Sequence, residues 1–311
     1  MNKFSFLLPL KDRTKFTKRL LNNLNKKKCP YKLIIADGGK DKRIEAYLAD
    51  KSKYPYLNYE YIRYPFDQNL SDFYSKMSDA VSKIDSEFVS AIDNDDLIDL
   101  EGIPKCIKVL EDKSFSSARG AILENGKNIY SKYPNSIIQE TAALRMKEQT
   151  LHFHGNWHNV VRRNHLVAIW KLINVVRPNN FRIVEQINGY LHTLWGNSFR
   201  GEFPLIIRKT VEMIILGKFK LSTHFPPQDE WIKADYWPSE FNKLAEVVSA
   251  SISYFDNISL DDSFNLFCKT YPLKLPHLKD LLNMRIKEAK LLGYNYERIN
   301  KMQIILKDLE I

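Results

Sequence analysis

The stretch FVSAIDNDD, residues 88–96, runs from an apolar segment directly into three carboxylates within four residues. The apolar part is typical of a buried strand. We call residues 93–96 the acidic turn. Like charges this close repel one another, so each carboxylate is costly to keep ionised unless a cation lies nearby. The stretch therefore predicts a buried strand that ends at a cation site.

The N-terminal third of the chain alternates between strand-like and helix-like segments around this stretch. Apolar runs predict strands at 4–10, 31–36, 57–62 and 88–92, and helical spacing of apolar residues predicts helices at 14–26, 41–48 and 70–84. This order indicates an α/β fold in which helices flank a mostly parallel sheet. Ligands of such sheets bind at the carboxyl ends of the strands.

Polar clusters follow two more of these predicted strands. They are Lys11, Asp12 and Arg13 after the first strand and Asp37, Gly38 and Gly39 after the second. Glycines let the backbone approach a ligand closely. Asp37 can accept a hydrogen bond from an N–H group such as the imide of uracil, and Lys11 and Arg13 can form ion pairs with a diphosphate. Two structural alternatives stay open: Asp12 caps the helix that follows, or the glycines only supply positive φ in a turn.

The acidic turn predicts a magnesium or manganese site. Asp93 and Asp95 are separated by one residue, so a turn can direct both carboxylates to one side and leave metal positions open for phosphate oxygens. A twelve-residue calcium loop starting at Asp93 would need an oxygen ligand where Leu97 stands and a glycine where Ile98 stands. That spacing excludes a calcium loop.

Composition narrows the class of protein. The 311 residues are 44% hydrophobic, which suffices for a large core, and 47 basic against 37 acidic residues give a net charge of +10. The basic residues are dispersed and accompany no nucleic-acid-binding motif, so we expect no nucleic-acid partner. Three widely separated cysteines favour free thiols, and no segment has the length of a signal peptide or membrane span, so we expect a cytoplasmic protein.

These motifs carry a resemblance to a known family. FSFLLPLKDR (4–13), LIIADGG (33–39), NLSDFYSKMSDAV (69–81) and FVSAIDNDD resemble the GT-A nucleotide-diphospho-sugar glycosyltransferases, family-2-like, that build bacterial polysaccharides. The resemblance covers roughly the first two-thirds of the chain. It implies a GT-A, Rossmann-like fold and a metal-dependent, inverting transfer of one sugar from a nucleotide-diphospho-sugar to a glycan or lipid-linked acceptor.

The resemblance also implies roles for individual residues. The nucleotide would contact Pro9, Lys11, Asp12, Arg13, Asp37, Gly38, Lys76, Asp93 and Asn94. The metal, Mn²⁺ or Mg²⁺, would be held by the Asp-x-Asp motif at Asp93 and Asp95, with His224 as a third ligand. Lys76 lies off the apolar stripe of its helix, so a lysine that simply faces solvent is an open alternative.

The family places its catalytic base on a helix that FRIVEQINGYLHTLW, residues 181–195, resembles. Glu185 is the candidate, because an inverting transfer needs a carboxylate to take the proton of the acceptor hydroxyl. The sequence departs from the family pattern here, since Glu185-Gln186 replaces Glu-Asp. A structural alternative is that Glu185 only pairs with Arg182 on the same helix.

Acceptor contacts are predicted in LHFHGNWHNVVRRNH, residues 151–165. Trp157 can stack on a sugar face, and His154 and Arg162 can bind hydroxyls or phosphate. The four histidines of this stretch fit no common zinc spacing. Burial of Trp157 in the core is the alternative.

The chain is predicted to comprise a glycosyltransferase domain at 1–238, with a nucleotide-binding half near 1–100 and an acceptor half near 101–238, and a helical C-terminal extension at 239–311. The extension could form a homo-oligomer, pack on the catalytic domain or touch the inner face of the plasma membrane. Two other functions stay open: a catalytically silent carbohydrate-binding protein and a sugar nucleotidyltransferase. The latter would want a glycine-rich loop that LPLKDRTK lacks.

Overall fold

The computed structural model describes residues 3–129, 136–153, 155–208 and 227–309. The chain divides into two compact units. Unit 1 comprises Met1–Ser136, Trp157–Trp170 and Phe199–Lys220, and unit 2 comprises Ile137–Asn156, Lys171–Ser198 and Leu221–Ile311. The predicted domain boundary at residue 238 stays a prediction.

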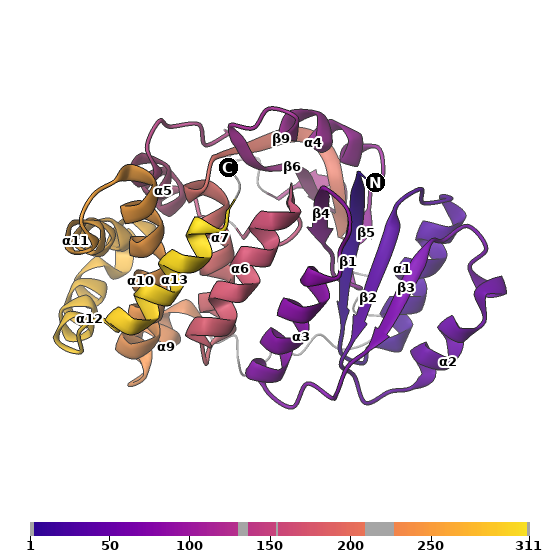
Figure 1. Cartoon of the computed structure of the whole chain (residues 1–311), viewed down its shortest axis with the longest axis horizontal. Coiled ribbons are helices and arrows are strands. Elements are labelled where there is room, and N and C mark those ends of the chain that lie inside the picture. The colour runs from indigo at the N-terminus through magenta and orange to yellow at the C-terminus, as the bar shows by residue number, and fades with distance from the viewer. Residues whose placement is uncertain (1–2, 130–135, 154, 209–226, 310–311) are drawn as a thin grey trace. The chain divides into compact units, whose positions relative to one another are not determined.

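Unit 1 begins with the strands and helices that the sequence predicts (Figure 1). They are β1 (Phe4–Leu10), α1 (Thr14–Lys26), β2 (Lys32–Asp37), α2 (Arg43–Ala49), β3 (Tyr59–Arg63), α3 (Leu70–Ser82) and β4 (Phe88–Ala91). All seven predicted elements are present, and their ends differ from the predicted ones by no more than two residues. The α/β fold class is confirmed.

The four strands are parallel neighbours in the order β3-β2-β1-β4. Leu10 lies opposite Asp37 in the β1–β2 pair, and Leu7 lies opposite Ala91 in the β1–β4 pair. The carboxyl ends of β1, β2 and β4 therefore meet at one edge of the sheet. The sequence predicts its ligand site at this edge.

Antiparallel strands extend the sheet beyond β4. In order they are β8 (Val160–Arg162), β6 (Phe115–Glu124), β9 (Asn197–Arg208) and β5 (Leu97–Ile98), with β7 (Lys127–Asn128) paired to β6. Helix α4 (Gly102–Leu110) packs against β6. The parallel arrangement thus holds for the first four strands, and β8 with β4, β6 with β8, β7 with β6 and β5 with β9 pair antiparallel.

The core of unit 1 explains why these segments form strands and helices. Phe6 and Leu7 point to opposite faces of β1 and neither is exposed, so both faces of the strand are covered. Helix α1 buries Phe16, Leu20 and Leu24 along one stripe, which is the spacing of an amphipathic helix.

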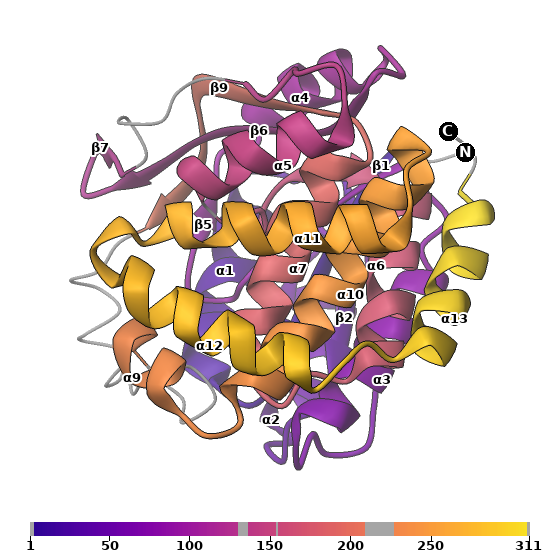
Figure 2. The ribbon, with the colours of Figure 1, turned by 90° about the vertical axis from the view of Figure 1, so that its left-hand side faces the viewer.

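Unit 2 is helical over most of its described length. Its helices include α5 (Ala142–Leu151), α7 (Phe181–Leu194), α9 (Gln228–Lys233), α10 (Trp237–Asp256), α11 (Leu260–Thr270), α12 (Lys279–Leu291) and α13 (Tyr296–Lys307), and α6 (Arg163–Val176) runs into this unit from unit 1. Figure 2 shows α11 and α12 in front of α10 and α7. The predicted C-terminal helices are confirmed.

Helix α10 is the centre of unit 2. It packs against α7, α11, α12 and α13, and its Trp237 and Phe241 stack with ring centroids 4.8 Å apart. Asp256, the last residue of α10, accepts hydrogen bonds from the backbone N–H groups of Ala142 and Ala143 at 2.7 and 2.8 Å. These two donors start α5, so the end of α10 caps the beginning of α5.

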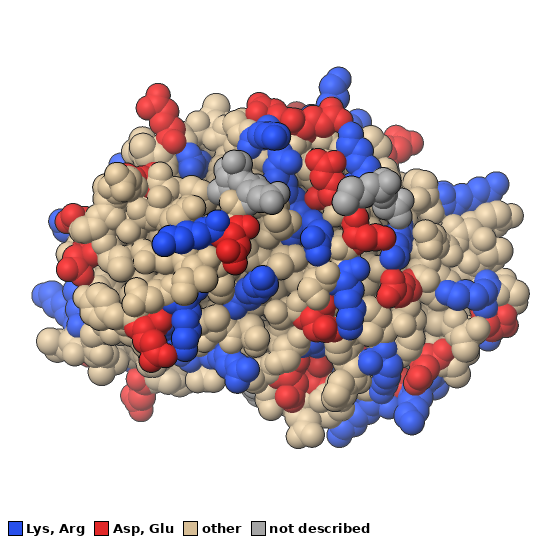
Figure 3. Space-filling view, viewed as in Figure 1, with Lys and Arg blue, Asp and Glu red and all other residues tan. Residues whose placement is uncertain are grey.

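The surface fits the dispersed charge of the sequence. Lysines and arginines are interspersed with acidic residues over the face drawn in Figure 3. The three cysteines are buried, and none of them forms a disulfide. Among the described helices, none combines the length and the apolar character that crossing a bilayer requires.

Candidate functional site

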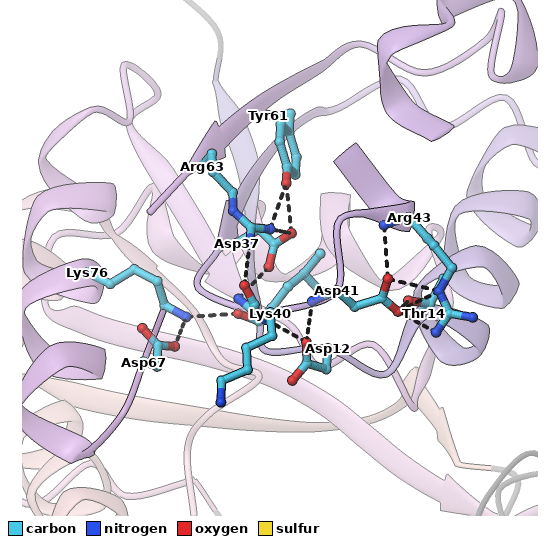
Figure 4. Close-up of polar contacts among 12 residues, drawn as sticks. Asp12, Thr14, Asp37, Lys40, Asp41, Arg43, Tyr61, Arg63, Asp67 and Lys76 are labelled. Atoms are coloured by element: carbon cyan, nitrogen blue, oxygen red, sulfur yellow. Dashed lines mark hydrogen bonds and ion pairs between the residues drawn. The ribbon is translucent and has the colours of Figure 1, made fainter. Parts of the chain in front are cut away.

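The ends of β1, β2 and β3 are tied together by side-chain carboxylates. We call this region the three-strand edge. Asp12 Oδ1 accepts hydrogen bonds from the backbone N–H groups of Lys40 and Asp41 at 2.7 and 2.8 Å (Figure 4). Arg13, at the N-cap of α1, makes no capping hydrogen bond through its side chain. Asp12 therefore links two loops, and the alternative that it caps α1 is wrong.

Gly38 and Gly39 are needed for space. A Cβ on Gly39 would lie 2.5 Å from the backbone nitrogen of Asp12, and a Cβ on Gly38 would lie 2.3 Å from Asp67 Oδ1. Neither glycine has a positive φ. The alternative that they serve a left-handed turn is therefore wrong, because they are required by close packing between strand ends.

Asp37 is held in one orientation at the end of β2. Its side chain accepts hydrogen bonds from the backbone N–H of Gly39 at 2.8 Å, from the Tyr61 hydroxyl at 2.7 Å and from Arg63 Nη1 at 3.0 Å. The residue is 2% exposed. Each carboxylate oxygen can accept more than one hydrogen bond, so a ligand N–H can still be accommodated.

Lys76 on α3 is buried rather than solvated. Its Nζ donates to the carbonyl of Leu10 at 2.9 Å and to the carboxylate of Asp67, and both side chains of the ion pair are 2% exposed. Burial lowers the pKa of Lys76 and raises that of Asp67, while their mutual attraction opposes both shifts. The pair holds β1 to the loop after β3, and a contact of Lys76 with phosphate stays a prediction.

The two central residues of the acidic turn, Asn94 and Asp95, face helix α1 and its N-cap residue Arg13. Asp95 Oδ2 accepts a hydrogen bond from Arg13 Nη2 at 2.8 Å, and the carbonyl of Asp95 accepts one from Arg19. Asn94 Nδ2 donates to Thr17 Oγ1 at 3.0 Å. The structure thus places Asp95 and Asn94 among basic and polar side chains of α1 and of its N-cap residue.

Asp93, Asp96 and His158 form a cluster at the end of β4. One ligand atom from each residue lies within 4.8 Å of the other two. His158 Nε2 is 3.4 Å from Asp96 Oδ2 and 3.7 Å from Asp93 Oδ2. The antiparallel pairing of β8 with β4 brings His158 to the cluster. Val161 lies opposite Val89, so the residues that precede β8, His158 among them, lie beside the residues that follow β4.

The charges in this cluster are strongly coupled. Burial works against ionisation of Asp96, but hydrogen bonds from His158 and Arg208 outweigh it and lower the pKa of Asp96 to about 2. Desolvation raises the pKa of Asp93 to about 6, although 44% of its side chain is exposed. The pKa of His158 is raised because the neighbouring acids outweigh its own burial.

The cluster fits a divalent cation. The two carboxylates suit Mn²⁺ or Mg²⁺, and the imidazole adds a nitrogen ligand of the kind that transition metals accept. Nδ1 of the buried His158 has no hydrogen-bond partner in the part of the chain that the structure describes. Of the predicted metal ligands, Asp93 belongs to the cluster and Asp95 pairs with Arg13 instead. His224 lies outside the described residues.

Unit 2 contains Glu185, the predicted base. Glu185 is half-buried on α7, whereas its neighbour Gln186 is 2% exposed and accepts a hydrogen bond from the Tyr271 hydroxyl at 2.9 Å. Position 186 therefore points into the helical core, and of the two positions only Glu185 keeps partial access to solvent. Glu185 also attracts Arg182 and Lys274 electrostatically, which keeps the alternative of a structural ion pair open.

The predicted acceptor residues are spread over different surroundings. Trp157 is half-buried, with its ring 6.0 Å from that of Trp170. Arg162 donates to the carbonyl of Leu110 at 2.5 Å, at the end of α4. His154 lies outside the described residues. Contact of these residues with an acceptor stays a prediction.

Sequence reasoning missed three of the residues gathered at this site. Asp67, His158 and Arg208 come from a loop and two strand ends that no local motif marks. Their partners were visible in the sequence, but the pairing of β8 and β9 with distant strands was not.

Comparisons with known proteins place this geometry in context. The model of the family described as glycosyl transferase family 2 matches residues 5–170. A crystal structure of Staphylococcus aureus TarS residues 1–349 in complex with UDP-GlcNAc is similar at 14% identity, with a TM-score of 0.54 over 97% of this chain and 88% of that one. The complex of the same TarS fragment with UDP is similar at 15% identity, with a TM-score of 0.51 over 98% and 91%. No curated protein sequence matches.

Proposed function

The chain belongs to glycosyl transferase family 2, and from that premise we propose that it is a metal-dependent, inverting glycosyltransferase. Its fold is of the GT-A type, and its activity is the transfer of a sugar from a nucleotide-sugar donor. We further propose that the acceptor is a glycan or a lipid-linked glycan of bacterial surface polysaccharide synthesis. The enzyme would act in the cytoplasm, at the inner face of the plasma membrane.

The observation that carries this proposal is the meeting of polar groups at one edge of the sheet. Asp12, Asp37 and the acidic turn follow β1, β2 and β4, which are adjacent parallel strands. The crevice at the carboxyl ends of such strands is the usual ligand site of an open α/β sheet. This edge offers both hydrogen-bond acceptors and a cluster of candidate metal ligands. Such a combination suits a nucleoside diphosphate with its divalent cation.

The donor side follows from these groups. Asp37, fixed by Gly39, Tyr61 and Arg63, would accept an N–H of the nucleobase. Lys11, whose Nζ lies 5.2 Å from the centre of the Phe66 ring, and Arg13 would meet the diphosphate. TarS binds UDP-GlcNAc and UDP in structures of the same fold, which supports a uridine diphosphate sugar as the donor.

Asp93, Asp96 and His158 would hold a divalent cation, Mn²⁺ or Mg²⁺. Asp95 was predicted as a ligand and would join them by releasing Arg13. The bound ion would supply Lewis-acid stabilisation of the departing diphosphate. The protein residues would fix the position of the ion and compensate its charge.

Glu185 is proposed as the base that takes the proton from the acceptor hydroxyl. The base must be an ionised carboxylate that an acceptor can reach from solvent. Glu185 meets the second requirement, because it is only half-buried on α7. Gln186 cannot take a proton and its side chain is engaged with Tyr271. Loss of the family's second acid therefore leaves one candidate at this position.

The first test is a thermal-shift screen of the full chain with UDP, GDP, CDP and dTDP, each with and without Mn²⁺. A nucleotide at 100 times its dissociation constant stabilises the folded state by about 2.7 kcal/mol. We expect a shift with UDP that needs Mn²⁺ and disappears in Asp93→Ala. If no nucleotide shifts the melting temperature under any condition, the proposed function is wrong.

A second arm of the experiment separates binding from catalysis. Glu185→Gln should keep the nucleotide-dependent shift and lose transfer by about 10²-fold or more, because only the proton acceptor is removed. A variant that retains full transfer activity would exclude Glu185 as the base while leaving the donor site intact.

A further inference from the structure

Arg208 lies directly across the sheet from the acidic turn. Strands β5 and β9 are antiparallel, and Leu97 lies opposite Ile207. Continuing this register by one residue brings Arg208 opposite Asp96. Cross-strand neighbours of opposite charge attract each other, so the pairing of two short strand ends places a cation beside the candidate metal ligands.

The contact between Arg208 and Asp96 is bidentate. Arg208 Nε is 3.2 Å from Asp96 Oδ1, and Arg208 Nη2 is 3.2 Å from Asp96 Oδ2. His158 lies 3.4 Å from the second of these oxygens. Both oxygens of Asp96 are therefore occupied by protein cations or donors, in a carboxylate that is only 3% exposed.

A divalent ion and a guanidinium cannot both bind Asp96 in this arrangement without strong repulsion, because two cations would share one buried carboxylate. The ion therefore competes with Arg208 for the Asp96 oxygens, and the Arg208 side chain is 32% exposed and thus has a route to solvent. A guanidinium in turn matches the paired oxygens of a phosphate as well as those of a carboxylate.

We propose that Arg208 is the resident counterion of the candidate metal site and that it exchanges Asp96 for the diphosphate of the donor when the metal binds. The proposal rests on the function proposed above and adds to it a coupling between metal and nucleotide. With Mn²⁺ alone, the ion competes with Arg208 for Asp96 and brings no anion for the guanidinium. With the nucleotide present, the displaced guanidinium gains a diphosphate, so each ligand strengthens binding of the other.

The test measures Mn²⁺ affinity directly, by the electron paramagnetic resonance signal of the free ion, on the full chain. Arg208→Gln removes the competitor, and we expect Mn²⁺ alone to bind about fivefold more tightly than to the wild type. Adding UDP should then raise the Mn²⁺ affinity of this variant by a smaller factor than it does in the wild type.

Two further variants sharpen the result. Arg208→Lys keeps the positive charge but loses the planar fork, so its Mn²⁺ affinity should fall between those of the wild type and Arg208→Gln. It also carries the test if Arg208→Gln does not fold. Lys83→Gln removes one positive charge from an exposed pair with Asp79 and should leave Mn²⁺ affinity unchanged.

If Mn²⁺ alone binds Arg208→Gln no more tightly than the wild type, Arg208 is not a competitor and the exchange is wrong. Failure of the proposed function looks different, because the wild type would then show no nucleotide-dependent thermal shift at all. The ratio of Mn²⁺ affinities between variant and wild type tests the exchange, and the thermal shift of the wild type tests the function.

Discussion

The three-strand edge and the acidic turn both present carboxylates at the same side of the sheet, but they hold them differently. Asp12 accepts hydrogen bonds from backbone N–H groups of a neighbouring loop, and Asp37 accepts one from the backbone N–H of Gly39 in the turn that follows it. Asp96 instead faces Arg208, whose long side chain is 32% exposed. A backbone donor cannot leave without rearranging its loop, whereas an exposed arginine can rotate into water. One region is therefore fixed, and the other is able to exchange partners.

The largest effect on stability is expected at the buried ion pair of Lys76 and Asp67, beside the three-strand edge. Lys76→Met leaves Asp67 buried without its partner, and we expect the free energy of unfolding to fall by about 3 kcal/mol. Lys83→Met is the matched control near the same helix, because Lys83 pairs with Asp79 at the surface and should matter by less than about 1 kcal/mol. Urea denaturation measures both, and equal effects would contradict a fixed edge.

A second test changes the space between two loops of the fixed region. Gly39→Ala forces a Cβ to within 2.5 Å of the Asp12 backbone nitrogen, so the loops must separate. We expect a loss of about 2 kcal/mol in the free energy of unfolding, together with weaker nucleotide binding. Gly155→Ala is the control, since a Cβ there meets no atom of the described residues within 4 Å. Normal nucleotide affinity in Gly39→Ala would show that the edge tolerates rearrangement.

Acid titration tests the acidic turn. The pKa of Asp96 is about 2 in the folded chain, below its ordinary value of 3.8, so its ion pairs stabilise the fold above pH 4. This contribution is lost as the pH falls from about 4 to 2 and amounts to about 2 kcal/mol. Asp96→Asn should lack that part of the acid dependence when unfolding is followed between pH 2 and 5. An unchanged pH dependence in Asp96→Asn would mean that the neighbours of Asp96 do not lower its pKa in the folded chain.

The smallest effect is expected at Arg13, the exposed arginine that pairs with Asp95 of the acidic turn. Arg13 is 40% exposed where it pairs with Asp95, so Arg13→Gln should lower the free energy of unfolding by less than about 1 kcal/mol. Nucleotide affinity should nevertheless fall, because Arg13 is proposed to meet the diphosphate. Calorimetric titration with UDP and Mn²⁺ separates the two quantities, and a large loss of stability with normal affinity would place Arg13 among the fixed residues.

The sequence predicted the part of the fold that depends on local pattern. Strand β1 and helix α1 begin and end where apolar spacing puts them, and the polar residues after β1, β2 and β4 do meet at one edge. These results follow from periodicity and from the rule that parallel strands align their carboxyl ends.

The partners of those polar residues could not be predicted in the same way. His158 reaches Asp96 only because β8 runs antiparallel to β4, and Arg208 reaches it only through the register of β5 with β9. Strand pairing between segments that are distant in sequence leaves no local signal. The burial of Lys76 does not follow from the sequence pattern for a related reason, since its partner Asp67 lies in a loop whose path the pattern does not specify.

The hydrogen bond from Tyr271 to Gln186 has a consequence for how such a chain can change during evolution. Helix α7, which carries Glu185, is packed against α10 and is tied to the segment after α11 by this buried contact. Recombination that replaced only the segment from α10 to α13 would leave a buried amide without its partner and an apolar helix face without its cover. The C-terminal helices and the helix bearing the proposed base should therefore be inherited and exchanged as one block.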